Sequence, residues 1–266
     1  MYRGFQLDLR GQSQEQHTFI TELLNFSNQG KALKEVNESI IKKTLDSFFL
    51  SNGSIDGSKM QTNWFPQIKA DVFISHSHQD EELTLGLAGW LEKHFGLKAF
   101  VDSAVWGYSD YLLQKIDDKY CLQEKEEKGL YSYSYKKRNR STSHVHMMLS
   151  VALTRMIDST ECLFFLNTPQ SVSPNLSIAN QETTSSPWIY SEIVMSRLVM
   201  KKQKGHGIQF RRANESKPDL KVEYPLLMDH LKKLTSKDLQ EWKRRCQDYS
   251  SRHIKALDFL YELNPQ

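Results

Sequence analysis

The chain has 266 residues, of which 39% are hydrophobic and 25% charged, a composition typical of folded globular proteins. The formal net charge is only +3, which argues against a protein devoted to nucleic acid or to an anionic membrane surface. No stretch reaches the about 20 apolar residues that cross a bilayer, and the N-terminus has no apolar core of signal-peptide length.

Residues 1–66 predict a helical extension followed by a linker. Two apolar stripes, one around Phe19–Leu24 and one from Leu33 to Phe48, predict two helices within 14–49. The turn-forming NQG at 28–30 separates the stripes, so we expect an αα-hairpin. The following SNGSIDGSK, 51–59, is rich in turn-forming residues and predicts the linker.

From Ala70 the pattern changes to alternating strands and helices. DVFIS (71–75) and LKAFVD (97–102) predict two short strands, joined by a helix with leucines at four-residue spacing and stopped by Gly96. CLFFLN (162–167) is continuously apolar, as expected of a parallel strand covered on both faces. The helix predicted before it carries an apolar stripe of Val145, Met148, Leu149, Ala152 and Met156. This order predicts an α/β fold with a parallel, flavodoxin-like sheet flanked by helices.

The C-terminal region predicts an edge strand and a long helix. LKVEYPLL (220–227) alternates like a half-exposed strand that Pro225 limits. A helix from Ser236 carries apolar residues at nearly heptad spacing, which suits either docking onto the chain's own α/β domain or a coiled-coil partner. We prefer docking. The chain thus divides into an extension at 1–66, an α/β domain at 67–235 and a C-terminal helix at 236–266.

Three cysteines, Cys121, Cys162 and Cys246, lie far apart in the sequence. Their odd number and wide spacing favour reduced thiols over a disulfide framework. We therefore expect a cytoplasmic protein.

Ligands of open α/β sheets bind beyond the C-terminal ends of the strands, where the strand order reverses. Three segments are expected there: SHSHQD (75–80), DSAVWGYSDY (102–111) and SPWIYSEI (186–193). In the third, Ser186 and Pro187 predict the start of a helix. Glu192 follows Trp188 by one turn, which places a single carboxylate on the same face of an otherwise apolar helix.

These motifs together resemble a TIR (Toll/interleukin-1 receptor) domain. The likeness lies in DVFISHSHQDEELTLGLAGWLEKHFGLKAFVD, ECLFFLN and SPWIYSEI, and spans roughly residues 70–200. The bacterial enzymatic branch is the most similar. Its members cleave NAD⁺ at the nicotinamide–ribose bond with the helix glutamate as catalytic group. Several act in anti-phage defence, including the Thoeris type, which makes a cyclic or modified ADP-ribose signal.

The resemblance implies roles for particular residues and partners of this chain. Glu192 would be catalytic. The implied substrate-binding residues are Ser75, His76, Ser77, Asp102, Trp106, Tyr111 and Trp188. NAD⁺ would be the substrate, with no cofactor and no metal. The resemblance further implies self-association through the TIR domain and a downstream effector that senses the product; we expect no nucleic-acid partner and no membrane partner.

The expected chemistry explains why one acid is enough. Nicotinamide leaves NAD⁺ as a neutral base, so the reaction needs no general acid. Positive charge develops on the ribose as the bond breaks, as in glycoside hydrolysis. A preorganised carboxylate beside the ribose stabilises this charge.

Structural roles compete with each of these assignments. Glu192 suits a rim residue paired with Arg197 or a lysine, and Trp188 suits a core aromatic. Residues 75–78 suit a helix cap, with Ser77 and Asp80 resembling a capping box. The domain as a whole is also compatible with a non-catalytic TIR module that recruits other TIR domains, although recruitment does not require an acidic residue at position 192.

Residues 118–143 are an insertion relative to the compact TIR pattern. Its YSYSYKKRNR mixes aromatics and cations, which suits nucleic acid or phosphate, but the adjacent EKEEK offsets the charge. We therefore expect a solvated loop. His-x-His within 141–148 raises the possibility of zinc, but its spacing fits no standard finger.

Overall fold

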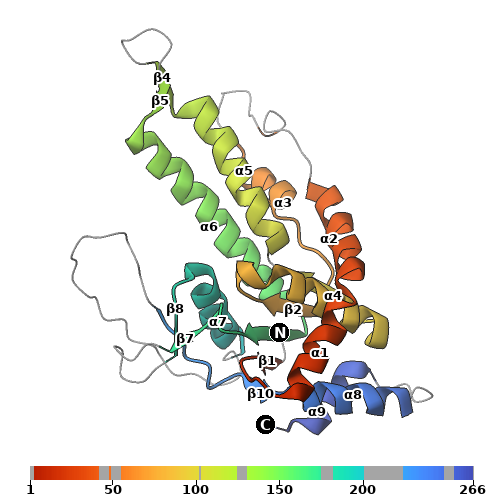
Figure 1. Cartoon of the computed structure of the whole chain (residues 1–266). Helices are drawn as coiled ribbons and strands as arrows, with labels where there is room; N and C mark the ends of the chain where they lie inside the picture. The colour runs from red at the N-terminus through yellow and green to blue at the C-terminus, as the bar shows by residue number, and fades with distance from the viewer. Residues whose placement is uncertain are drawn as a thin grey trace.

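The computed structural model describes residues 3–41, 48, 55–101, 103–124, 131–174, 182–200, 224–248 and 255–265. These residues form a five-stranded parallel β-sheet flanked by helices, consistent with a flavodoxin-like fold (Figure 1). The α/β class that the sequence predicts is therefore confirmed.

The sheet has the strand order β10-β1-β6-β2-β3. Its members are β1 (Arg3–Asp8), β2 (Val72–Ser75), β3 (Ala99–Val101), β6 (Cys162–Asn167) and β10 (Lys232–Leu234). Counted from β2, the strands β3-β2-β6 follow the 2-1-3 beginning of flavodoxin order. The next place is taken by β1 from the N-terminus, which pairs in parallel with both β6 and β10.

Successive residues of each strand supply two separate hydrophobic cores, one on each face of the sheet. Phe73 and Phe165 point to one face, whereas Ile74 and Phe164 point to the other. The face of Phe164 is covered by α1 (Gln14–Leu24), α4 (Glu81–Phe95), α8 (Ser236–Asp248) and α9 (Ala256–Leu263). Helix α2 (Ser27–Ile41) packs on α4 outside this layer.

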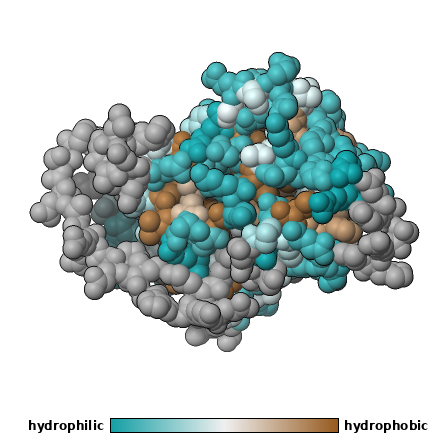
Figure 2. All heavy atoms as spheres, turned by 90° about the horizontal axis from the view of Figure 1, so that it is seen from below, coloured by the Kyte–Doolittle hydropathy of each residue, from teal (hydrophilic) through white to brown (hydrophobic). Residues whose placement is uncertain are grey.

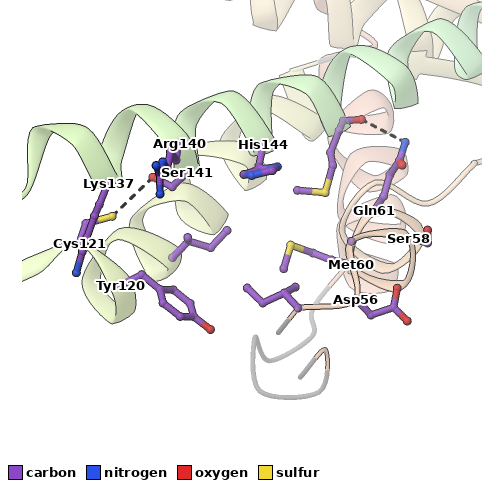
Figure 3. Close-up of a pocket in the computed structure, with 14 residues that line it drawn as sticks. Asp56, Ser58, Met60, Gln61, Tyr120, Cys121, Lys137, Arg140, Ser141 and His144 are labelled. Atoms are coloured by element: carbon purple, nitrogen blue, oxygen red, sulfur yellow. Dashed lines mark hydrogen bonds between the residues drawn. The ribbon is translucent and has the colours of Figure 1, made fainter. Parts of the chain in front are cut away.

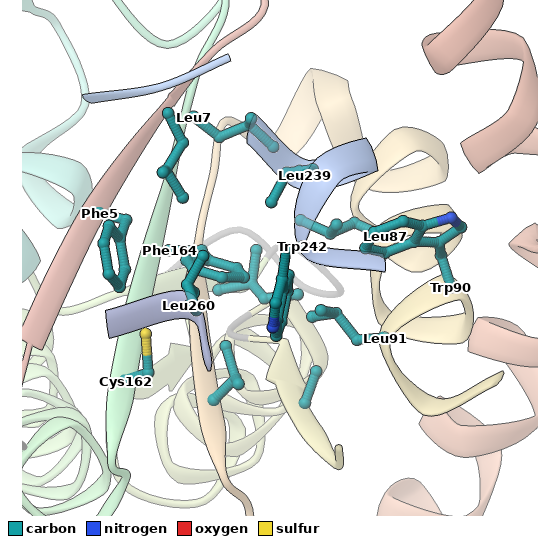
Figure 4. Close-up of a cluster of buried hydrophobic side chains, with 14 of the residues drawn as sticks. Phe5, Leu7, Leu87, Trp90, Leu91, Cys162, Phe164, Leu239, Trp242 and Leu260 are labelled. Carbon is teal, nitrogen blue, oxygen red and sulfur yellow. The ribbon is translucent and has the colours of Figure 1, made fainter. Parts of the chain in front are cut away.

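The C-terminal helices complete the core on the Phe164 face. Leu239, Trp242 and Leu260 are buried there (Figure 4). The ring of Trp242 stacks on Phe95 with 3.8 Å between centroids. Docking onto the chain's own domain is thus confirmed. The prediction of a single long helix is wrong, because α8 ends at Asp248 and the backbone of Lys255 is extended before α9 begins. Tyr249 and His253, which are expected on that helix, lie outside the described residues.

The Phe165 face is covered by helices that project from the sheet. They are α3 (Gly57–Trp64), α5 (Ser103–Tyr120), α6 (Tyr135–Ser159) and α7 (Pro187–Met200). Helices α5 and α6 run side by side away from the sheet, and the strands β4 (Leu122–Glu124) and β5 (Tyr131–Tyr133) pair at their far end (Figure 1).

Two predicted loops are helical in the structure. The aromatic residues around Gly107 predict a flexible loop at 102–111, but α5 begins at Ser103 and continues through Tyr111. The expected solvated insertion at 118–143 instead contains the end of α5, the β4–β5 hairpin and the first turns of α6. Buried residues such as Leu112, Ile116 and Ser141 tie both helices to the domain, which is why neither segment is a free loop.

The N-terminal helices also differ in detail from the prediction. The break lies at Asn25 and Phe26, whereas NQG falls inside α2. Gly30 has to be small because a Cβ there would lie 1.9 Å from the carbonyl oxygen of Leu85. The expected linker ends in a helix, since Asp56 caps α3 through the backbone N–H of Lys59.

A second, antiparallel sheet of three short strands lies beside α7. It consists of β7 (Ser173–Pro174), β8 (Glu182–Thr184) and β9 (Tyr224–Pro225). Of the predicted edge strand at 220–227, only Tyr224–Pro225 is a strand, and residues 220–223 lie outside the described part.

None of the helices within the described ranges combines the length and apolar character needed to cross a bilayer. On the face seen in Figure 2, hydrophilic residues interrupt the hydrophobic ones.

Candidate functional site

Glu192 lies in the second turn of α7. The hydroxyl of Ser186 caps this helix by accepting the backbone N–H of Ile189 at 3.3 Å, as the sequence predicts. The side chain of Glu192 is only 1% exposed, and its Oε2 accepts a 2.6 Å hydrogen bond from Oγ of Ser75. The rim pairing with Arg197 is wrong, because that guanidinium binds Asp229 instead.

Ser75 is the last residue of β2, so this hydrogen bond fixes α7 to the C-terminal edge of the sheet. Ser75 and the following His76 are both buried. Ser77 then caps the short 3₁₀ helix η2 (His78–Asp80) through the N–H of Gln79 at 3.4 Å. The predicted caps and the predicted site residues therefore occupy the same turn.

Asp80 does not complete the capping box that the sequence suggests. Its carboxylate accepts a 2.5 Å hydrogen bond from the hydroxyl of Thr168, which follows β6. Burial raises the pKa of Asp80, although the Thr168 hydrogen bond and the positive charge of His76 oppose that rise. The contact joins the loop after β2 to the loop after β6.

Asn167 is a buried polar residue that the sequence analysis does not assign to the site. It ends β6, and the register that pairs Ser75 with Phe165 puts Asn167 two residues beyond, at the same edge. Its side chain is fully buried, and neither amide atom has a hydrogen-bond partner within the described chain. A polar residue at the end of an otherwise apolar strand is the sequence signal that marks it.

The arrangement so far matches the switch point of the sheet. The chain leaves β2 toward β3 on one side and returns to β6 on the other, so the ends of β2 and β6 form the crevice where such folds bind ligands. Ser75, His76, Asn167 and Glu192 come from the two strands and from α7. The structure thus brings the predicted acid into contact with the predicted Ser75, and the predicted His76 follows Ser75 at the same strand end.

Other predicted site residues have different surroundings. The ring of Trp188 packs edge-on against His146 of α6, with 5.6 Å between centroids, and it borders the core of the Phe165 face. Tyr111 is 50% exposed and lies against Trp64 of α3, more than two turns along α5. These contacts favour packing over substrate binding for both. Asp102 and the side chain of Trp106 lie outside the described residues.

A second group of charges lies at the neighbouring strand end. Arg10 binds the carboxylates of Asp8 and Glu182, and Asp8 pairs with Asn167 across β1 and β6. The hydrogen bonds that Arg10 donates to the Asp8 carboxylate are the main cause that raises the pKa of Arg10. Because two carboxylates already hold Arg10, we do not assign it a phosphate-binding role.

The described part of the chain contains free thiols but no cluster of side chains that could hold a metal ion. All three cysteines are free thiols; Cys121 and Cys162 are buried and Cys246 is partly exposed. Within the described ranges, no three side chains of His, Cys, Asp or Glu converge in the manner of a metal centre. The buried side chains at the switch point supply a carboxylate, a hydroxyl, an imidazole and an amide.

This chemistry suits the stabilisation of positive charge. A carboxylate held by a neighbouring hydroxyl in a poorly solvated position keeps its orientation, and its field is weakly screened. Ser75 donates directly to the acid, so the pair does not have the serine–histidine geometry of a nucleophilic triad. Comparisons with protein-family models, with curated proteins and with solved structures found no match to this chain.

Proposed function

We propose that the protein is a TIR-type enzyme that cleaves NAD⁺ at the nicotinamide–ribose bond, with the carboxylate of Glu192 as its catalytic group. The observation that carries the proposal is the hydrogen bond between Ser75 and Glu192 at the switch point. It joins the first and last of the three motifs on which the resemblance to TIR domains rests. The product would be ADP-ribose or a cyclic or modified form of it, used as a signal in bacterial anti-phage defence.

In the proposed reaction, the bond between C1′ of the ribose and the nicotinamide nitrogen breaks. The bonding electrons leave with nicotinamide, which becomes neutral, and the positive charge passes to the ribose. The carboxylate of Glu192 stabilises that charge while Ser75 fixes its orientation. Water then attacks C1′ and releases a proton, which gives ADP-ribose; attack by a group of the same nucleotide gives a cyclic product instead.

The burial of Glu192 sets a condition on this mechanism. At 1% exposure, its carboxylate is covered by the surrounding chain and does not meet a ribose in this arrangement. We therefore propose that the site opens before NAD⁺ reacts and that the protein in its resting form has low activity. Self-association through the TIR-type domain is the proposed trigger, and an effector that senses the product is the proposed partner.

The decisive experiment compares nicotinamide release from NAD⁺ by the parent protein and by Glu192→Gln. The glutamine amide has nearly the same size as the carboxylate and can still accept a hydrogen bond from Ser75, but it lacks the negative charge. We expect a loss of about a hundredfold or more, comparable to the removal of one key electrostatic group. Glu161→Gln, at the opposite end of β6, is the matched control and should keep the parent rate.

The same burial supports a second candidate, a non-catalytic interaction module. In that case Glu192 only ties α7 to β2. An active parent whose Glu192→Gln form releases nicotinamide at an unchanged rate would refute the catalytic role. A parent that releases no nicotinamide at any concentration, yet binds a second TIR domain, would establish the interaction module.

A further inference from the structure

A ligand-sized cavity lies between α3, α5 and α6 (Figure 3). It measures about 810 Å³, within the range of small-molecule sites. Its lining includes neither Ser75 nor Glu192, so it is separate from the site proposed for NAD⁺.

One wall of the cavity is a face of α6 that carries two cationic side chains and an imidazole. Lys137, Arg140 and His144 line it at spacings of three and four residues, so they share one side of the helix. In the part of the chain that the structure describes, no ion pair uses any of the three. By contrast, the adjacent Arg138 binds the buried Asp117 at 2.9 Å. Among the described residues, the positive charges of Lys137 and Arg140 therefore have no carboxylate paired with them.

The facing surfaces are mostly apolar. Met60 of α3 and Ile116 of α5 provide flexible and branched side chains, and Tyr120 of α5 adds an aromatic ring. Met148, one turn beyond His144, extends this apolar surface along the same face of α6. The one acid in the lining is Asp56, whose Oδ1 already accepts the backbone N–H of Lys59 at the start of α3. An apolar floor thus lies opposite a cationic wall.

We propose that this cavity binds a small organic anion with an apolar body. A phosphate or carboxylate head group would pair with Lys137 and Arg140, whose guanidinium presents parallel donors to such groups. The apolar body would lie on Met60, Ile116 and Met148. A purely apolar ligand would leave the cations unpaired, whereas a small inorganic anion would leave the floor uncovered. This proposal does not depend on NAD⁺ cleavage.

Binding is tested with the fluorescent aromatic sulfonate 8-anilinonaphthalene-1-sulfonate on the full-length protein. Octyl phosphate and octanoate should each displace the probe, and the tighter of the two identifies the preferred head group. A parallel titration with adenosine monophosphate distinguishes a nucleotide from an acyl-type ligand. Octylamine and inorganic phosphate should each compete at least tenfold more weakly than the better octyl anion. Equal displacement by octylamine would overturn the proposal.

Charge reversal on the wall supplies the second test. Lys137→Glu with Arg140→Glu should weaken binding of the octyl anion at least tenfold, and the same pair changed to Gln gives a milder form if the first does not fold. The control is Lys136→Glu with Arg155→Glu, which alters the charge of the same helix equally but outside the cavity lining. Equal weakening in the control, or unchanged binding in both cavity variants, would refute a site at this wall.

Discussion

The hydroxyl of Ser75 lies 2.6 Å from the carboxylate of Glu192, although 117 positions separate them in the sequence. One residue ends a strand and the other lies in the second turn of a helix on the Phe165 face. Because both side chains are buried, the contact is screened little by solvent. It both holds α7 against the sheet and orients the proposed catalytic acid.

Ser75→Ala should separate those two effects. Loss of the hydroxyl removes the hydrogen bond that Ser75 donates to the buried carboxylate of Glu192, which should lower the free energy of unfolding by about 1–3 kcal/mol. If Glu192 is catalytic, kcat for nicotinamide release should also fall about tenfold while KM changes little, because the acid loses its orientation. Ser143→Ala, which removes an exposed hydroxyl on α6, is the control. A stability loss with parental kcat would count against the orienting role.

The parts of the fold that the sequence predicts are those with strong local signals. Helix α4 has leucines at regular spacing and ends at Gly96, whose φ of 67° is the left-handed conformation expected of a helix-terminating glycine. β6 is apolar throughout and buried throughout. In both cases the local pattern and the final environment agree, so periodicity is sufficient.

The missed strands owe their structure to their neighbours. β1 contains Gly4 and the polar Gln6, yet it is buried because β6 and β10 pair with it on both sides. β10 is three residues long and two of them are exposed lysines. Neither pattern alone indicates a strand. Local sequence patterns therefore predict only three of the five strands of the sheet, namely β2, β3 and β6.

The candidate site shows a similar division. The motifs predict Ser75 and Glu192, and the topology rule predicts that they meet, since both lie at strand ends or beside them. The buried amide of Asn167 and the Asp80–Thr168 contact depend on strand register, which motif spacing does not encode. Trp188 and Tyr111 show another difference, because the motifs predict substrate binding whereas the structure gives each ring an aromatic neighbour to pack against.

The close packing of α1 on α4 gives a prediction about stability. A Cβ at Gly86 would lie 2.4 Å from the carbonyl oxygen of Leu23, a backbone atom that cannot move alone. Gly86→Ala should therefore reduce the free energy of unfolding by about 2 kcal/mol or more. Gly57→Ala, where nothing lies within 4 Å, should be neutral or slightly stabilising. Thermal melts of both variants check the contrast, which equal melting temperatures would contradict.

The link between α1 and α8 gives a prediction about pH. Burial alone would raise the pKa of Glu22, but hydrogen bonds from Lys243, Trp90 and Gln240 more than offset it and the pKa is lowered. A carboxylate with a depressed folded-state pKa stabilises the fold above its unfolded pKa, near 4.3, and loses that contribution as pH falls through the folded value.

Glu22→Gln should therefore lower stability at pH 7 by about 1 kcal/mol, a figure reduced for its partial exposure, and by less at pH 3. Urea unfolding at both values measures the difference. Glu15→Gln, on the same helix with an exposed ion pair, is the control and should show almost no change. A stability loss in Glu22→Gln that is as large at pH 3 as at pH 7 would contradict the assignment.

Asn167 allows the proposed function to be tested against folding. Its amide is fully buried and has no hydrogen-bond partner among the described residues, so the fold bears the cost of desolvating it. Asn167→Leu has nearly the same shape without polar atoms and should raise the free energy of unfolding by about 1 kcal/mol. If the amide instead serves to bind the nucleotide in the opened site, nicotinamide release should fall at least tenfold in the same variant. Greater stability with lower turnover would support a functional amide at the switch point. Lower stability would show that Asn167 is structural and would remove it from the site.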